Sequence, residues 1–220
     1  MEFNLMLHFR AFSLLVLLAS LSACQLLTPS ASPTQPALRM QGTITNSEGQ
    51  WVFQQCNRPN AYIINSSSAL DQEFVPLITA APNGFFADLS GDLDAAQQRF
   101  TPTQRYRLEI EGHDCSDPDF ARLQLRASGN EPAWSILQTP RGLIFNQIGE
   151  AALVLPYIEE QLPNGRFHLS SQANNQNLDI WITTQQCIDN MSGAVYHLQA
   201  KLQWNQQTFN GCAAFGALRD

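Results

Sequence analysis

The sequence predicts a mainly β protein built from two small β-rich domains. Short runs that alternate apolar and polar residues recur along the chain, and turn signals rich in glycine, asparagine and proline separate them. The turn signals are Asn83-Gly84, Gly91-Asp92, Pro140-Arg141-Gly142, Asn164-Gly165 and Asn210-Gly211. The chain has 220 residues. That length is enough for one sizeable core or two small ones.

The N-terminus has the features of a bacterial lipoprotein signal peptide. An apolar run from Ala11 to Ala19 is too short to span a bilayer as a helix, which takes ~20 apolar residues. The next residues, Leu-Ser-Ala-Cys at 21–24, resemble a lipobox. The resemblance implies that residues 1–23 are removed. It also implies that Cys24 is lipidated and anchors the chain to a membrane.

The segment after Cys24 is expected to be a tether. Gln25 stands where enteric lipoproteins of the inner membrane carry aspartate, so the resemblance implies the bacterial outer membrane, facing the periplasm. Residues 24–39 are rich in proline, serine, threonine and alanine. Such a segment buries too little apolar area to offset the entropy of ordering it, so we expect it to be flexible.

Four cysteines remain after Cys24, and an even number in an exported chain predicts disulfides. Three pairings are open, of which the sequential one keeps each bond within one half of the chain. A soft copper site at Cys187, Met191 and His197 is the alternative. An oxidising compartment favours pairing Cys187 with Cys212 instead, so we expect no metal and no cofactor. The four cysteines are Cys56, Cys115, Cys187 and Cys212.

Several strands and one helix are expected between the turns. The clearest strand patterns cover Trp51–Phe53, Tyr106–Ile110, Leu178–Ile182 and Tyr196–Trp204. In the last of these, His197 falls on the polar face and is expected to be solvated. A helix is predicted after Ser68 as its cap, with Leu70, Phe74, Leu77 and Ile78 on one face, although Pro76 counts against it. A domain boundary is expected near residues 127–129.

The first block, residues 40–126, resembles a known family. It opens with Gln41-Gly42-Thr43-Ile44, continues with Trp51 to Cys56 and the helical segment, and then reaches Phe85 to Leu93. This order resembles the OB-fold-like C-terminal domain of the NlpE family of envelope lipoproteins. The resemblance implies an OB-like five-stranded barrel.

The second block, residues 127–220, resembles a family of poorly characterised bacterial envelope lipoproteins. The shared motifs are Gly129-Asn130-Glu131-Pro132-Ala133-Trp134, Cys187-Ile188-Asp189-Asn190-Met191-Ser192 and Gly211-Cys212-Ala213. Ala133 replaces the aromatic residue that is usual in the family. The resemblance implies a β-barrel or sandwich-like domain in the cell envelope, and it implies no activity.

The motifs support two interpretations. As a binding patch, Trp134 would supply contact area and the carboxylates of Glu131 and Asp189 would orient a ligand. As structural elements, Trp134 would fill the end of a barrel, and Asp189 and Ser192 would bond backbone N–H groups in a turn held by a disulfide to Cys212. The structural interpretation is favoured.

Charge and motifs exclude several functions. The net charge is −7, from 12 Lys+Arg and 19 Asp+Glu, and this argues against nucleic-acid binding. The chain contains no GxSxG or HExxH motif. The acidic stretch from His113 to Asp119 lacks the spacing of an EF-hand and is expected to be a polar loop. We therefore expect no enzyme activity, and a hydrolase is disfavoured.

The sequence favours an outer-membrane-anchored periplasmic lipoprotein that acts as a non-catalytic binding or sensing module. Its expected partners are the membrane, through Cys24, and an envelope protein, while its oligomeric state stays open. One alternative is a protein inhibitor of a cationic enzyme such as lysozyme, because charge complementarity speeds encounter. The other is an envelope-stress or redox signalling lipoprotein whose disulfide responds to reductant.

Overall fold

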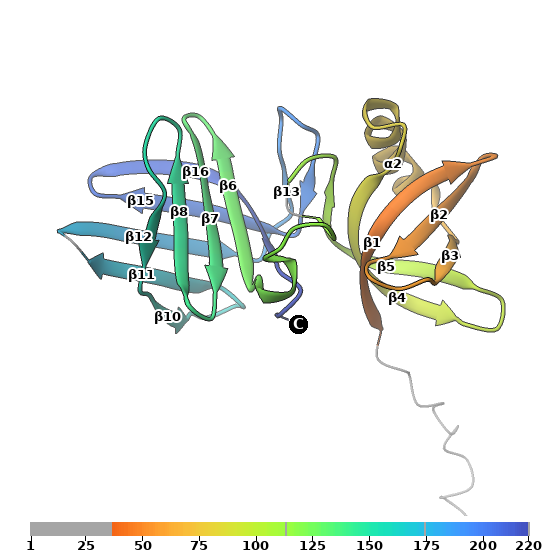
Figure 1. Cartoon of the computed structure of the whole chain (residues 1–220), viewed down its shortest axis with the longest axis horizontal. Coiled ribbons are helices and arrows are strands. Elements are labelled where there is room, and N and C mark those ends of the chain that lie inside the picture. Colours follow the sequence, from red (N-terminus) through yellow and green to blue (C-terminus); the bar gives the residue numbers. More distant parts are fainter. Residues whose placement is uncertain (1–36, 113, 174, 220) are drawn as a thin grey trace, which may run out of the picture. The chain divides into compact units, whose positions relative to one another are not determined.

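The computed structural model describes residues 37–112, 114–173 and 175–219 (Figure 1). The expected signal peptide, Cys24 and most of the expected tether lie outside these residues. The segment Ala37–Asp220 forms one compact unit. None of the helices in the described residues has the length and hydrophobicity that crossing a membrane requires.

The predicted mainly β architecture is confirmed, with two sheets. The first is seven-stranded, in the order β13-β14-β5-β3-β2-β1-β4, and β4 also pairs with β5. Its pairs are antiparallel except for the parallel pair of β3 and β5. Its strands are β1 (Leu38–Ser47), β2 (Gln50–Gln55), β3 (Ala61–Ile64), β4 (Phe85–Asp94), β5 (Arg99–Glu109), β13 (Cys187–Ile188) and β14 (Val195–Tyr196).

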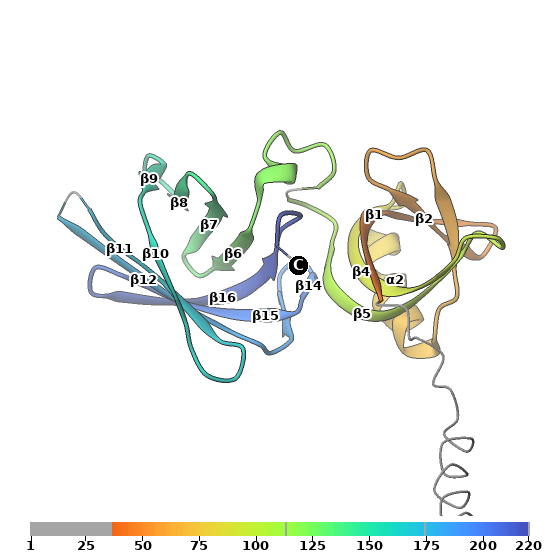
Figure 2. The same ribbon diagram turned by 90° about the horizontal axis from the view of Figure 1, so that it is seen from below.

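The second sheet is nine-stranded, antiparallel and curled into a half-barrel (Figure 2). Its order is β10-β11-β12-β15-β16-β6-β7-β8-β9, so it is one open sheet with β10 and β9 at its edges. Its strands are β6 (Leu125–Asn130), β7 (Ala133–Thr139), β8 (Gly142–Gln147), β9 (Leu153–Leu155), β10 (Ile158–Gln161), β11 (Phe167–Ala173), β12 (Gln176–Thr183), β15 (Leu198–Trp204) and β16 (Gln207–Phe215).

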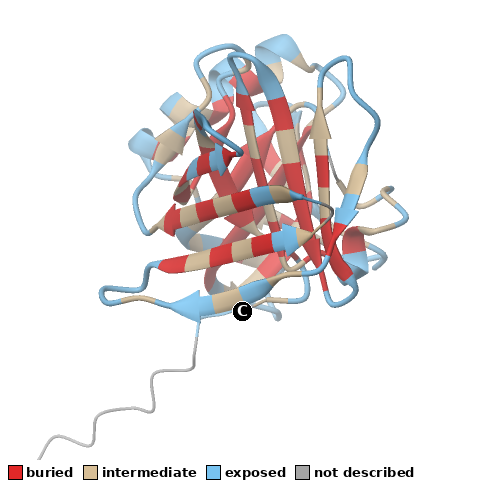
Figure 3. Cartoon of the chain, turned by 90° about the vertical axis from the view of Figure 1, so that its left-hand side faces the viewer, coloured by how far each residue is buried: buried red, intermediate tan, exposed pale blue. Residues whose placement is uncertain are grey.

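Each sheet has its own apolar core. Buried and less buried residues alternate along its strands, as Figure 3 shows for the second sheet. The core of the half-barrel includes Leu125, Ile136, Phe145, Ile180 and Leu202. The core of the first sheet includes Ile44, Phe53, Phe74, Phe85 and Phe100.

Helix α2 (Ser68–Ala80) lies between β3 and β4 in the chain and closes the first core. Its N-cap is Ser67, one residue before the expected cap, and the Ser67 hydroxyl accepts a hydrogen bond from Leu70 N at 3.2 Å. The predicted residues Leu70, Phe74 and Leu77 are buried. The helix continues through Pro76, although a proline inside a helix is unfavourable and Pro76 weakened the prediction. A short 3₁₀ turn, η2 (Phe120–Arg122), precedes β6.

Both predicted disulfides are present in the sequential pairing, Cys56–Cys115 and Cys187–Cys212. Two of the predicted turns are wrong: Gly91-Asp92 lies inside β4 and Asn210-Gly211 inside β16. A glycine inside a strand often marks a close approach of another backbone. At Gly91, for example, a Cβ atom would lie 2.1 Å from the Thr101 carbonyl oxygen.

The strand predicted over residues 196–204 is divided between the two sheets. Tyr196 pairs with Arg107 of β5 in the first sheet, whereas Leu198 begins β15 in the second. His197 lies between them, and its backbone N–H donates to the Tyr106 carbonyl oxygen at 3.0 Å. Its ring packs against Tyr106 and Phe215 at centroid distances of 4.8 and 4.9 Å. The prediction of a solvated His197 is therefore wrong.

We expect the stability of the protein to fall as the pH drops below about 6.5, because His197 must be protonated on unfolding. Burial lowers the pKa of His197 to about 4, although a hydrogen bond to the Tyr106 carbonyl and the nearby Asp88 oppose this. As the pH falls, His197 is therefore protonated in the unfolded chain at a higher pH than in the folded protein. The contribution of His197 to stability is therefore fully present above the pKa of histidine in the unfolded chain. It is lost as the pH falls from there to about 4.

The loss between about pH 7 and 4.5 should be roughly 2 kcal/mol, measured by urea unfolding. His197→Gln should remove this part of the pH dependence and leave the rest of the profile in place. An unchanged slope in the variant would contradict the prediction.

Candidate functional site

The hairpin formed by β13 and β14 is held at its base from two sides. Cys187 pairs with Tyr196 inside the hairpin, and β14 pairs with β5. The disulfide from Cys187 to Cys212 attaches the hairpin to β16. A small buried cluster of Ala194, Tyr196, Cys212 and Ala214 lies beneath it. The hairpin is therefore part of the first sheet and is tied to the second sheet by the disulfide.

The turn of the hairpin, residues 189–193, is organised by Asp189. The Asp189 carboxylate accepts hydrogen bonds from Met191 N at 2.8 Å and Ser192 N at 3.3 Å, and the Ser192 hydroxyl accepts one from Ala194 N at 3.3 Å. These are the turn hydrogen bonds that the sequence predicted. Burial would raise the pKa of Asp189, but the hydrogen bonds from Asn130, Met191 and Ser192 outweigh it and lower the pKa. Asp189 is thus ionised at neutral pH.

One side-chain hydrogen bond joins the tip of this hairpin to the second sheet. The Asn130 amide at the end of β6 donates to Asp189 Oδ1 at 2.8 Å. Asn130 is exposed, and its partner lies 59 residues away in the chain. The bond therefore closes a contact between the hairpin tip and the β6–β7 turn.

A first cavity of about 700 Å³ opens on one side of this contact. The outward-facing residues of β6, β7 and β8 contribute Ser128, Ser135 and Asn146, and the Asn146 amide donates to the Ser135 hydroxyl at 3.2 Å. The hairpin turn contributes Asp189, Met191 and Ser192. Glu109 at the end of β5 and the next three residues, 110–112, also line this cavity. The lining thus combines amides, hydroxyls and charged groups with an exposed methionine.

A second cavity of about 730 Å³ opens on the other side of the contact. It shares five lining residues with the first. The shared residues are Ser128, Gly129, Asn130, Asp189 and Met191. Its other lining residues include Glu131, Lys201 and both cysteines of the Cys187–Cys212 disulfide. The two cavities therefore flank the hairpin tip.

A buried ion pair lies at the inner end of the first cavity. Arg126 Nη1 donates to both carboxylate oxygens of Glu109, at 2.5 Å for Oε2, and Arg107 Nε lies 3.6 Å from the same oxygen. Arg107 and Glu109 are only 3% and 6% exposed. Burial also raises the pKa of the neighbouring Tyr196 hydroxyl, and Glu109 raises it further. The pair is thus desolvated, which makes each partner dependent on the other.

Gly112 covers this ion pair with backbone. Its φ angle is +119°, and a Cβ atom there would lie 2.5 Å from Glu109 Oε1 and 2.6 Å from Arg126 Nη1. Only glycine fits both the backbone conformation and the space. The backbone of the loop after β5 therefore lies directly against the pair.

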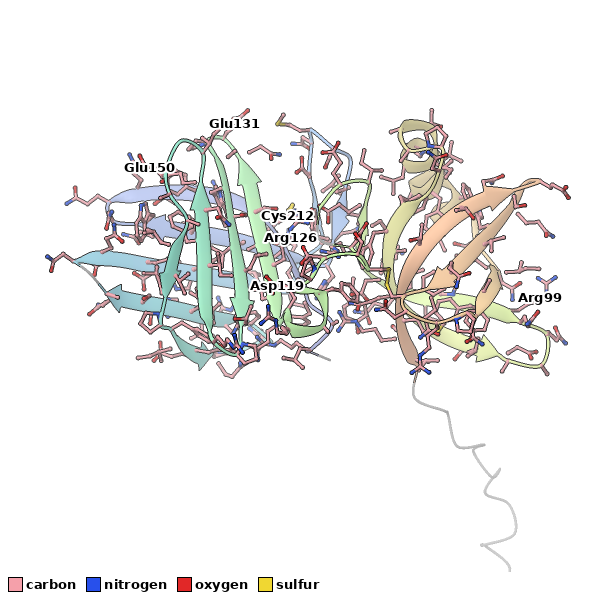
Figure 4. All side chains as sticks on the ribbon, in the orientation of Figure 1. Arg99, Asp119, Arg126, Glu131, Glu150 and Cys212 are labelled. Carbon is pink, nitrogen blue, oxygen red and sulfur yellow. A yellow bond between two sulfur atoms is a disulfide. The ribbon has the colours of Figure 1, made fainter. Side chains whose placement is uncertain are left out.

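The structure places the three candidate patch residues in different surroundings. Asp189 lines both cavities, and Glu131 is exposed and lines only the second. Trp134 is 4% exposed and belongs to the core of the half-barrel. In Figure 4, Arg126 and Cys212 lie on the side of the second sheet toward β13, whereas Glu131 lies at the end of that sheet.

Two motif glycines make room for Trp134. A Cβ atom on Gly129 would lie 2.5 Å from Trp134 Nε1, and one on Gly211 would lie 2.8 Å from the indole Cζ2. The strands β6 and β16, which carry these glycines, are neighbours in the sheet. The indole therefore lies across two strands at positions where no side chain intervenes. This geometry favours the structural interpretation of Trp134.

The charged residues of the site do not stand out in the sequence. Arg107 and Glu109 are the polar members of the alternating pattern that predicts a strand over Tyr106–Ile110, and such residues are typically exposed, yet both are buried. Arg126 was not singled out at all. The alternation in β5 is typical of a strand with one solvent-exposed face. Nothing in the local sequence indicates that Arg126 of β6 and the backbone at Gly112 lie against that face.

Removing the Cys187–Cys212 disulfide should destabilise the protein by ~3 kcal/mol, because the bond closes a loop with a sequence separation of 25 residues. The matched change, Cys187→Ala with Cys212→Ala, should also increase hydrogen exchange in residues 187–196. Cys56→Ala with Cys115→Ala is the control, since it should destabilise the chain without selectively exposing this hairpin. Equal hydrogen exchange of residues 187–196 in both variants would contradict the role of the Cys187–Cys212 disulfide in holding the hairpin.

Comparisons with protein-family models, with curated proteins and with solved structures found no match to this chain. Among the described residues, no group of three or more His, Cys, Asp and Glu side chains is arranged to hold a metal ion.

Proposed function

We propose that this protein is a non-catalytic binding or sensing module of the bacterial envelope, anchored to the outer membrane through Cys24 and facing the periplasm. The observation that carries the proposal is the disulfide-held hairpin with an open cavity on either side. The fixed base offers a preorganised surface, and the exposed tip is accessible to a partner. Preorganisation favours affinity because less entropy is lost on binding.

The proposal includes an OB-like five-stranded barrel in the first sheet. The pairings run from β1 through β2, β3, β5 and β4 back to β1, and helix α2 lies between β3 and β4. This arrangement supports the resemblance to the NlpE-type domain. The resemblance of the second block to an envelope lipoprotein family belongs to the same proposal.

The anchor is tested by replacing Cys24 with serine. The unchanged chain should fractionate with outer membranes, and the variant should appear in the soluble or inner-membrane fraction. A variant that stays with the outer membrane would contradict the lipid anchor.

Binding at the site is tested with a photo-crosslinking residue at position 191. Met191 is 78% exposed at the hairpin tip, and Val75 on helix α2 is a control at 52% exposure. One saturable crosslinked product from position 191, absent from position 75, is expected in intact envelopes. The same products from both positions, or none from position 191, would contradict the proposal.

A second candidate function is inhibition of a cationic enzyme such as lysozyme. It is favoured by the net charge of −7 and by the carboxylates of Glu131 and Asp189 beside the cavities. Stoichiometric loss of lysozyme activity that Asp189→Asn weakens would support it. Full lysozyme activity at a large excess of the protein would exclude it.

A further inference from the structure

We propose that the Asn130–Asp189 hydrogen bond is a clasp over a passage between the two cavities, and that this passage takes an extended, basic polypeptide segment. The inference rests on the proposed binding function and names the class of partner. It follows from the geometry of the contact, the chemistry of the lining and the distribution of charge.

The clasp is a local contact that opens without loss of the surrounding structure. Asp189 keeps its hydrogen bonds to Met191 N and Ser192 N when Asn130 moves away, so the turn of the hairpin survives. The base of the hairpin stays fixed by the disulfide to Cys212 and by the pairing of β14 with β5. A single hydrogen bond to a charged group contributes about 1.5–3 kcal/mol, which thermal motion breaks frequently.

The lining of the passage suits the backbone of an extended chain. Amide and hydroxyl groups line both cavities and offer donors and acceptors to peptide N–H and C=O groups. These groups belong to Ser128, Asn130, Ser135, Asn146, Asn190 and Asn210. Aromatic residues in the lining, Trp134, Tyr196 and Phe209, are all buried, so they offer no platform for stacking a sugar ring.

Exposed apolar side chains stand at the rims of the cavities. Ile148, Ile188 and Met191 are 73%, 56% and 78% exposed. Flexible methionine adapts to side chains of different shape and is common at binding surfaces that accept several sequences. These residues would contact apolar side chains of the segment beside its backbone.

The charge of the lining favours a basic segment. Glu111, Glu131 and Asp189 line the cavities, while Arg126 is engaged by Glu109. Lys201, the single lysine of the sequence, lines the second cavity. Carboxylates thus outnumber exposed cations along the passage, in a chain whose net charge is −7. Such a field attracts a basic segment and repels nucleic acid.

The test measures binding of a short fluorescein-labelled peptide of alternating arginine and leucine to the chain from Gln25 to Asp220, by stopped-flow anisotropy. A peptide in which glutamate replaces arginine is the negative probe. Saturable binding of the basic peptide alone is expected. Glu111→Gln with Glu131→Gln should weaken it at least about fivefold. Glu48→Gln with Asp92→Asn, the same change of charge on the first sheet, should leave it unchanged.

The clasp itself is tested with Asn130→Ala, which opens it without changing the charge. If the clasp closes over the bound chain, both the association and the dissociation rates should rise about threefold or more. Loss of an ordinary contact would raise the dissociation rate alone. Asn60→Ala removes an exposed amide just before β3, outside the lining of both cavities, and should change neither rate.

Two results overturn the inference: absence of binding by the basic peptide, or an association rate in the Asn130→Ala variant that is no higher than in the unchanged protein. If crosslinking at position 191 still captures one envelope partner, the proposed function stands and only the class of partner is wrong. If that capture also fails, the proposed function falls as well.

Discussion

Replacing Trp134 with alanine is expected to lower the free energy of unfolding by about 3–5 kcal/mol, the cost of deleting a large buried aromatic side chain. Trp134 is 4% exposed within the core of the half-barrel, and its indole lies against Gly129 and Gly211. Alanine would leave a cavity that two rigid neighbouring strands cannot fill. Urea unfolding monitored by far-UV circular dichroism measures the change.

Trp181→Ala is the matched control for this prediction. Trp181 is on β12 of the same sheet, half-buried and stacked on His168 at a centroid distance of 4.9 Å. Its removal should cost clearly less, at most about 1.5 kcal/mol. Equal losses in the two variants would show that Trp134 is not the core residue that the geometry indicates. Crosslinking of a partner from position 191 should persist in both variants while they remain folded.

Glu109→Gln is expected to lower the free energy of unfolding by about 3–5 kcal/mol, because it breaks a buried ion pair and leaves desolvated charge behind. Arg107 and Arg126 would then lie near each other without the carboxylate between them. Burial already lowers the pKa of Arg107, and Glu109 opposes that effect. The double change Glu109→Gln with Arg126→Met should be less destabilising than Glu109→Gln alone, since it removes one of the two charges.

The control for this prediction is Glu160→Gln. The Glu160 carboxylate is 63% exposed and lies 3.3 Å from His168 Nδ1. Exposed ion pairs contribute little, so the loss should stay below about 1 kcal/mol. The double change Glu109→Gln with Arg126→Met is compared with each of its two single changes. If its loss of stability equals the sum of the two single losses, Glu109 and Arg126 do not interact energetically.

The sequence predicted those features that depend on local pattern or on counting. The helix near residues 68–80 follows from the spacing of Leu70, Phe74 and Leu77, and these residues are buried as expected. The even number of cysteines in the folded part predicted disulfides, and the sequential pairing is the one formed. The hydrogen bonds of Asp189 within its turn also follow from local chemistry.

Features that depend on distant strands were not predictable in the same way. The alternation from Tyr196 to Trp204 is continuous, yet the chain passes from one sheet to the other at His197 because β5 offers an edge to Val195 and Tyr196. Arg107 and Glu109 have the pattern of a solvent-exposed strand face, but both are buried, and Glu109 contacts Arg126 of β6 and the backbone at Gly112. Gly91 and Gly211 resemble turn residues in the sequence. They are needed inside strands because the Thr101 backbone lies close to Gly91 and the Trp134 ring lies close to Gly211.

The pairing of β14 with β5 has a consequence for the order in which the chain folds. As the polypeptide is synthesised from its N-terminus, β5 emerges long before Val195 and Tyr196, its partners at that edge. Until they arrive, Leu108 and Arg107 border an open strand edge, and such edges promote pairing with other chains. Contacts between residues so far apart in sequence also slow folding. The vulnerable species is therefore a partly synthesised chain, and its aggregation should depend on how quickly the C-terminal half follows.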